Sequence, residues 1–232
     1  MTREHRDLKA RRSVITGISA AAAGLTLGAT VARAQTRQAS RSGFQPVRHS
    51  EDAWLDALPG DHRAFIDSAS PNGGAEAVLY ANNIYRAHAS GYYGEPQDFA
   101  MVVCFRHAST PFGYGDAVWE KYGQLIDEII EFQDPITGRW PTRNLMNSRD
   151  HTMLPNRGVT LESLVVRGAH FAICDSATQF VASQLAASMG AKMEDVYAEL
   201  VASAIPNSHF VPAGVIAVTR AQEYGYSLLS AG

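Results

Sequence analysis

The sequence predicts an α/β fold, an open parallel sheet of about four to five strands with helices on both faces. Short apolar runs are nearly continuous, as in strands that are covered on both faces. These runs alternate with longer segments whose apolar residues recur with the helical period. The chain of 232 residues is 46% hydrophobic and 19% charged, a globular composition that excludes collagen, coiled coils and wholly disordered chains.

Strands and helices are expected to alternate along the chain. The apolar runs predict strands at 62–67, 98–105, 169–174 and 208–211. Helices are expected at about 75–89, 116–130, 175–189 and 193–204, with a final helix from Pro212 to about Leu228. Asp175 or Ser176 can cap the third helix, and Gly73-Gly74 is interpreted as a turn. This alternation favours a flavodoxin-like sheet with right-handed crossovers.

One long segment, 132–160, has no regular pattern. It is rich in Pro, Gly and Asn, and a loop of this length in a compact domain usually has a function or is disordered. Its apolar side chains indicate that it packs down, as a lid or as an oligomer contact: Trp140, Leu145, Met146, Met153 and Leu154.

The first residues are interpreted as a targeting segment. Arg11-Arg12 followed by Ser13 resembles the twin-arginine export motif, and Ala32-Arg33-Ala34 predicts cleavage after Ala34. The alternative is a single membrane-anchoring helix. We therefore expect a signal peptide at 1–34, a flexible lead-in at 35–50 and a single domain at 51–232. The mature protein would be periplasmic or secreted, without stable insertion in the membrane.

Removal of this segment makes the chain acidic. Residues 1–34 carry a charge of +4, so that 14 basic and 21 acidic residues remain, a net charge of −7. Such a domain should not bind nucleic acid, whose phosphates require a basic surface. No nucleic-acid partner is expected.

Two stretches near the C-terminus carry a family resemblance. Gly168 to Cys174 is a strand that ends in Cys, and Val211-Pro212-Ala213-Gly214-Val215 precedes Gln222-Glu223-Tyr224-Gly225-Tyr226. Together they resemble the DsrE/DsrF-like family of sulfur-relay proteins, over roughly residues 62–229. The resemblance implies that Cys174 carries sulfane sulfur and that the chain forms a homo-oligomer, a trimer or a trimer-based assembly. It also implies a small sulfur species or a thiol acceptor protein as the partner.

Cys174 is the leading candidate for a catalytic residue on chemical grounds as well. It ends a predicted parallel strand just before a helix, at the edge where ligands bind in open α/β sheets. Helix N-terminal amides stabilise a thiolate, whereas the adjacent Asp175 opposes one. The alternative is an inert, buried cysteine.

His107 is the second candidate, because it follows the second strand and should reach the same edge. It would pair with the thiolate or act as a general acid or base; the alternative is an ordinary loop histidine. Cys104 is interpreted as a core residue. In a flavodoxin-like order the first strand would separate the second from the third, with Cys104 and Cys174 about 10 Å apart, which argues against a disulfide.

No motif predicts a metal or a cofactor. C-x-x-C, H-x-H and H-E-x-x-H are absent, and without G-x-S-x-G a hydrolase of that type is not indicated. His170 lies about 13 Å from Cys174 along one strand, too far to share a metal. A mixed site of His107, Cys174 and His151 or Met153 stays open.

Three functions remain possible. The first is exported sulfur handling through a Cys174 persulfide, by a sulfurtransferase-like carrier. The second is a non-enzymatic binding or assembly protein of the same fold, in which Cys174 is structural. The third is a metal-dependent redox accessory.

Overall fold

The computed structural model describes residue 43 and residues 45–232, and Pro46–Gly232 forms one compact unit. The expected signal peptide at 1–34 and most of the lead-in at 35–50 lie outside the described residues. None of the helices in the described part of the chain is both long enough and apolar enough to cross a membrane.

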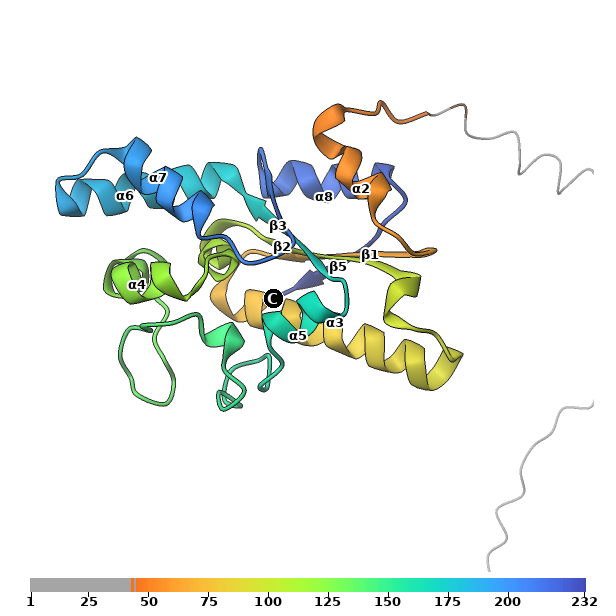
Figure 1. Cartoon of the computed structure of the whole chain (residues 1–232), viewed down its shortest axis with the longest axis horizontal. Helices are drawn as coiled ribbons and strands as arrows, with labels where there is room; N and C mark the ends of the chain where they lie inside the picture. The colour runs from red at the N-terminus through yellow and green to blue at the C-terminus, as the bar shows by residue number, and fades with distance from the viewer. Residues whose placement is uncertain (1–42, 44) are drawn as a thin grey trace, which may run out of the picture. The chain divides into compact units, whose positions relative to one another are not determined.

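The expected α/β fold is confirmed. Five parallel strands form one open sheet of flavodoxin-like architecture, but their order is β4-β3-β2-β1-β5. Helices cover both faces of this sheet (Figure 1). The strands are β1 (His62–Ser68), β2 (Phe99–Phe105), β3 (His170–Cys174), β4 (Ser208–Val211) and β5 (Ser227–Ala231).

The C-terminal segment differs from the prediction of one long helix. The last helix, α8 (Gly214–Glu223), begins two residues after Pro212 and ends well before Leu228. Gly225 adopts a left-handed conformation with φ 83°, which glycine tolerates and which turns the chain out of the helix. The chain then continues into β5, a strand that the sequence analysis missed.

The strand order corrects the expected position of the two cysteines. β1 does not separate β2 from β3; these two strands pair directly, with Cys104 opposite Ala172. Cys174 therefore lies one strand over and two residues further along, which places the Cα atoms about 8 Å apart. This separation still exceeds disulfide reach, and both cysteines are free. The sequence analysis argued against a disulfide between Cys104 and Cys174, but it assumed the wrong strand order.

The direction in which the chain crosses the sheet explains its two layers. From β1 to β4 each strand is added on the same side, so right-handed crossovers place the intervening helices on one face. The return from β4 to β5 runs the opposite way and places α8 on the other face, with α2 (Ala53–Ala57) (Figure 1). The first face packs against α3 (Pro71–Tyr92), α4 (Asp116–Ile130), α5 (Leu161–Val166), α6 (Asp175–Met189) and α7 (Met193–Ala202).

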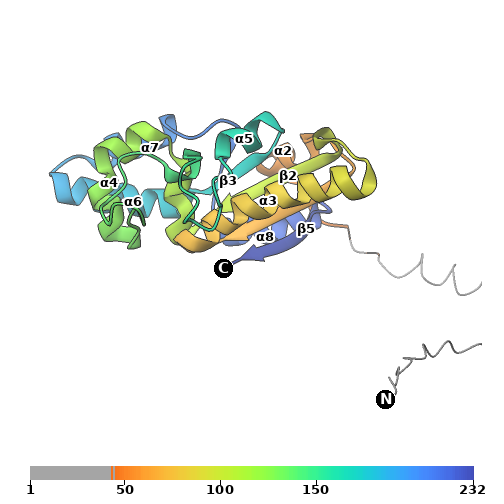
Figure 2. The same cartoon turned by 90° about the horizontal axis from the view of Figure 1, so that it is seen from below.

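Helix α3 starts earlier than predicted. Ser70 caps it by accepting a hydrogen bond from the Gly73 amide at 2.9 Å, and Pro71 occupies the first helical position. Gly73-Gly74 is therefore part of the first helical turn rather than a separate turn. Gly74 packs against the ring of Phe112, where a Cβ would overlap the ring. The helix runs along the strands, as the view from below shows (Figure 2).

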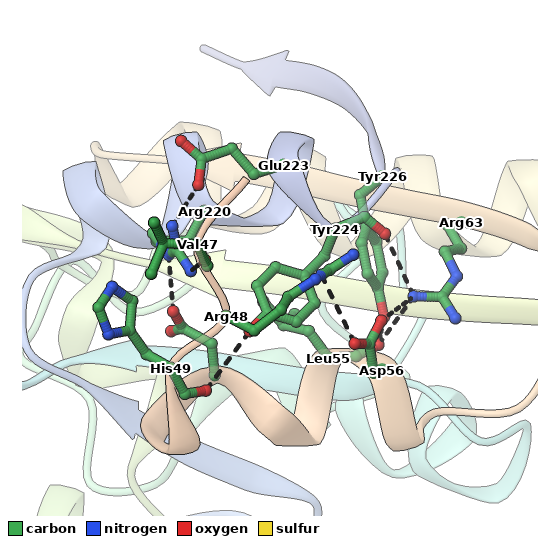
Figure 3. A network of polar contacts seen from close by, with 11 residues as sticks. Val47, Arg48, His49, Leu55, Asp56, Arg63, Arg220, Glu223, Tyr224 and Tyr226 are labelled. Atoms are coloured by element: carbon green, nitrogen blue, oxygen red, sulfur yellow. Dashed lines mark hydrogen bonds and ion pairs between the residues drawn. The ribbon is translucent and has the colours of Figure 1, made fainter. Parts of the chain in front are cut away.

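A short N-terminal strap, residues 46–58, lies against α8 and the beginning of β1 (Figure 3). It contains η1 (Ser50–Asp52) and α2. Arg220 of α8 binds Asp52 at 2.7 Å and the Val47 carbonyl at 2.5 Å, and Arg48 stacks on Tyr224. The last residues of the expected lead-in thus contact the domain.

The long loop packs down through three of the five apolar residues expected to do so, whereas Trp140 and Met153 are 37% and 68% exposed. Asn144, which is fully buried, donates to the carbonyls of Phe112 and Tyr114 at 2.8 Å each. Those carbonyls belong to the end of η3 (His107–Gly113) and the residue after it. Leu145, Met146 and Leu154 join the core, and two short helices that were not predicted follow: η4 (Leu145–Asn147) and α5.

Candidate functional site

An apolar cleft lies where the strand connections change face. The connection after β3 leads to α6 on one face, and the connection after β4 leads to α8 on the other. Ligands bind in open α/β sheets at this kind of switch point, beyond the carboxyl ends of the strands. A cleft of about 490 Å³ lies there, and both Cys174 and His107 line it. The structure thus brings the two predicted site residues together.

Cys174 occupies the N-cap position of α6, which corrects the expected cap at Asp175 or Ser176. Its side chain makes no capping hydrogen bond, and the residue is only 6% exposed. The sulfur therefore lies at the floor of the cleft beside the first turn of a helix of 15 residues, whose N-terminal dipole favours negative charge.

The acidic neighbour of Cys174 is held by other partners. The carboxylate of Asp175 accepts hydrogen bonds from the Tyr197 hydroxyl at 2.6 Å and from the Gln179 amide at 2.6 Å. This contact raises the pKa of Tyr197 to about 12. The cleft itself has no acidic side chain among the described residues that line it.

Arg106 supplies the positive charge of the cleft, and the sequence analysis missed it. Phe105 pairs with Ile173 in the sheet, so the next residues, Arg106 and Cys174, lie side by side. The guanidinium makes two hydrogen bonds of 2.8 Å to the carboxylate of Asp67, which ends the apolar run of β1. These bonds raise the pKa of Arg106, and burial opposes them.

Gly214 explains how α8 can pack against Arg106. A Cβ on Gly214 would overlap the Cβ of Arg106 and crowd the rest of its side chain. Only glycine lets the first turn of α8 pack directly on Arg106, opposite Cys174 and α6. The glycine of the Val-Pro-Ala-Gly-Val motif is therefore a close-approach position that forms one wall of the cleft.

His107 lies at the rim of the cleft, exposed to solvent. Its backbone is left-handed, with φ 53°, a conformation that non-glycine residues rarely adopt. Buried Ser109 holds this turn: its hydroxyl accepts from the Arg106 amide at 3.1 Å, and its one proton lies within reach of the Arg106 and Ser68 carbonyls, at 2.8 and 3.0 Å. The backbone of His107 is strained, and its exposed imidazole at the rim is suited to exchange protons with a bound thiol.

Cys104 differs from Cys174 in its access to the cleft. It is fully buried, and burial, reinforced by the charge of Asp67, raises the pKa of its thiol well above the ordinary value. It does not line the cleft. The structure therefore places Cys104 in the core, as predicted, and leaves Cys174 as the cysteine that a ligand can reach.

The mixed metal site considered from the sequence does not assemble. His151 binds Ser148 and Asp134 within the long loop and does not line the Cys174 cleft, and Met153 is exposed. His170 instead contacts His209 of β4 through ring nitrogens 2.9 Å apart. Within residues 45–232 the structure contains no group of three or more metal-ligating side chains.

No family model, no curated protein and no solved structure matches the chain. The site must therefore be interpreted from its own geometry. That geometry places one accessible thiol on the floor of an apolar cleft, beside a guanidinium and the N-termini of α6 and α8. A guanidinium and helix N-termini are groups that bind anions in proteins.

Proposed function

We propose that this protein handles sulfane sulfur through a persulfide on Cys174, consistent with the resemblance to the DsrE/DsrF-like family. The observation that carries the proposal is the cleft: it combines Cys174, Arg106 and two helix N-termini with no acidic lining residue. A persulfide is anionic near neutral pH, and these donors stabilise it. Apolar side chains of the cleft, including Ile130 and Val181, limit hydrolysis and oxidation by limiting water.

The reaction is an exchange of sulfur between thiols. The Cys174 thiol gives its proton to His107, and the thiolate attacks the outer sulfur of a persulfide or polysulfide donor. One S–S bond forms at Cys174 while the donor's S–S bond breaks, and the donor leaves as a thiolate. An acceptor thiolate then attacks the outer sulfur of the Cys174 persulfide, and Cys174 is released as a thiolate. No external oxidant or reductant is consumed.

The test is mass spectrometry of the intact domain before and after treatment with inorganic polysulfide. We expect an adduct of about 32 Da that is removed by reductant and maps to Cys174. Cys174→Ser should abolish the adduct. Cys104→Ser is the matched control, and it should load normally because Cys104 is fully buried. A protein that stays unmodified at Cys174, and whose Cys174 also resists alkylation in the folded state, would refute the proposal.

The alternative is a binding protein in which Cys174 has no chemical role. It is favoured by the 6% exposure of Cys174 and by two apolar side chains at the cleft, Phe180 and Val215, which are 56% and 59% exposed. An apolar ligand would then occupy the cleft. In that case Cys174→Ser is functionally silent, whereas Phe180→Ala weakens binding of a hydrophobic probe such as an anilinonaphthalene dye.

We also propose, from the sequence alone, that the chain is exported by the twin-arginine route to the periplasm or medium and acts there as a homo-oligomer. N-terminal sequencing of the exported protein should begin at Gln35. Replacement of Arg11-Arg12 by Lys-Lys should retain the uncleaved precursor inside the cell, and a cleavage unaffected by this change would argue against the route. Light scattering of the mature protein measures the oligomer.

A further inference from the structure

The loop at 132–160 holds a chain of polar side chains that the sulfur chemistry does not use. Nη2 of Arg143 donates to Oγ of Ser148 at 3.1 Å, and this oxygen lies 2.7 Å from Nδ1 of His151. Nε2 of the same ring lies 3.2 Å from Oδ1 of Asp134. Ser148, His151 and Asp134 are buried, at 4%, 6% and 9% exposure.

One assignment of the protons satisfies every partner in this network of side chains. Burial raises the pKa of Asp134, but hydrogen bonds from the Ile136 amide, His151 and Thr137 outweigh it and hold the pKa below its usual value. The ionised carboxylate only accepts, so Nε2 of His151 carries the proton. Arg143 only donates, so the Ser148 oxygen accepts from it; when the ring is neutral with its proton on Nε2, the serine proton is directed to Nδ1. The order is a serine hydroxyl, an unprotonated imidazole nitrogen and a carboxylate behind it.

A small cavity of about 250 Å³ lies beside this chain. Three of the four members line it, Asp134, Arg143 and His151, and the Ser148 hydroxyl is bonded to two of them. Arg139 and Trp140 also line it. Neither Arg139 nor Arg143 forms an ion pair with a carboxylate in the described part of the chain, which leaves positive charge at the cavity.

We propose that Ser148 is a nucleophile in a second site, which takes a small acyl ester with an anionic group. The arrangement meets the general requirement for an activated serine, a base within hydrogen-bond reach that a third group orients. In the common triad Nε2 faces the serine and Nδ1 faces the carboxylate, whereas here Nδ1 faces Ser148 and Nε2 faces Asp134. The proton transfer requires only that the serine and the carboxylate contact different nitrogens of one ring. The cavity is smaller than most drug-sized sites, which restricts the acyl group to a short one such as acetyl.

The reaction transfers the acyl group twice. Oγ of Ser148 bonds to the carbonyl carbon while its proton passes to Nδ1 of His151. The ester bond then breaks, and the alcohol leaves with that proton. Water, deprotonated by the same nitrogen, attacks the acyl-serine and releases the carboxylic acid, which regenerates Ser148. Arg143, which contacts Oγ before the attack, would donate to the carbonyl oxygen of the ester, on which the negative charge develops.

The test uses the Cys174→Ser protein, so that the cleft thiol cannot react. A fluorophosphonate probe should form an adduct that maps to Ser148, and 4-acetoxybenzoate, an acetyl ester that carries a carboxylate, should be hydrolysed faster than neutral p-nitrophenyl acetate. Ser148→Ala should abolish both. Ser163→Ala is the matched control, because that hydroxyl, near the same loop, bonds only to the Thr160 carbonyl, and we expect no change.

Asp134→Asn keeps the shape of the side chain and should lower the hydrolysis rate at least tenfold, with urea denaturation confirming that the variant folds. The labelling experiment uses the protein with Ser148 intact, so its outcome does not depend on whether a variant of Ser148, His151 or Asp134 folds. Absence of the adduct from Ser148 in the folded protein, or hydrolysis that persists in Ser148→Ala, would overturn the proposal. These four polar side chains would then only hold the loop in place.

Discussion

The ion pair between Asp67 and Arg106 offers a quantitative test of how the cleft is built. The Asp67 side chain is 9% exposed and the Arg106 side chain 27%, and two bonds of 2.8 Å join them. Asp67→Asn removes the negative charge and turns an amide donor toward the guanidinium. Loss of one partner of a buried pair costs about 3–5 kcal/mol. Because Arg106 keeps some contact with water, we expect about 2–3 kcal/mol.

Urea denaturation followed by tryptophan fluorescence measures this loss. For a domain of this size the same loss lowers the melting temperature by roughly 5–10 °C. Arg106→Met alone should also destabilise the protein, but the double variant should be more stable than the two single effects predict. Asp56→Asn is the control, because Asp56 is 52% exposed in its pair with Arg63 and should change stability by less than about 1 kcal/mol. A coupling free energy between Asp67 and Arg106 below about 0.5 kcal/mol would refute the reasoning.

Three further predictions follow from single contacts. Burial, with a smaller effect of the His170 charge, lowers the pKa of His209 to about 4. The folded state therefore resists protonation, so the free energy of unfolding should fall as the pH drops from about 6.5 toward 4, and in urea titrations it should fall less for His209→Gln. Asn144→Ala leaves two buried carbonyls without a donor and should cost about 2–4 kcal/mol by the same measurement. Gly214→Ala should displace Arg106, slow alkylation of Cys174 by iodoacetamide and, by overpacking, lower the free energy of unfolding by about 1–3 kcal/mol.

Much of the fold could be predicted because burial on both faces leaves a clear pattern. The strands β1 to β4 and the helix α4 lie within one residue of their predicted bounds. β5 was missed because its sequence, Ser227 to Ala231, is mostly exposed at a sheet edge and lacks a continuous apolar run. Gly225 was the available signal, since a glycine after a helical pattern often ends the helix. The strand order depends on which face each crossover covers, and no local pattern records that.

The candidate site was predicted in part. Cys174 and His107 could be found because both follow apolar strands, whose carboxyl ends meet at one edge. Arg106 directly precedes His107 and was overlooked, because its role depends on Asp67 from another strand. The chain from Arg143 to Asp134 could not be predicted, because it depends on the path of an irregular loop rather than on residue spacing.

The connection from β4 to β5 also determines which part of the domain folds last. β1 pairs with β5, although about 160 residues separate them, and α8 connects the two edges of the sheet. Pairing between such distant segments is slow in folding, because a long loop must close first. The strands β1 to β4 can assemble in order as the chain leaves the ribosome, but α8 cannot reach Arg106 until residue 214 and its helix are free. The wall of the cleft therefore forms last, and a nascent or truncated chain holds Cys174 in an open groove.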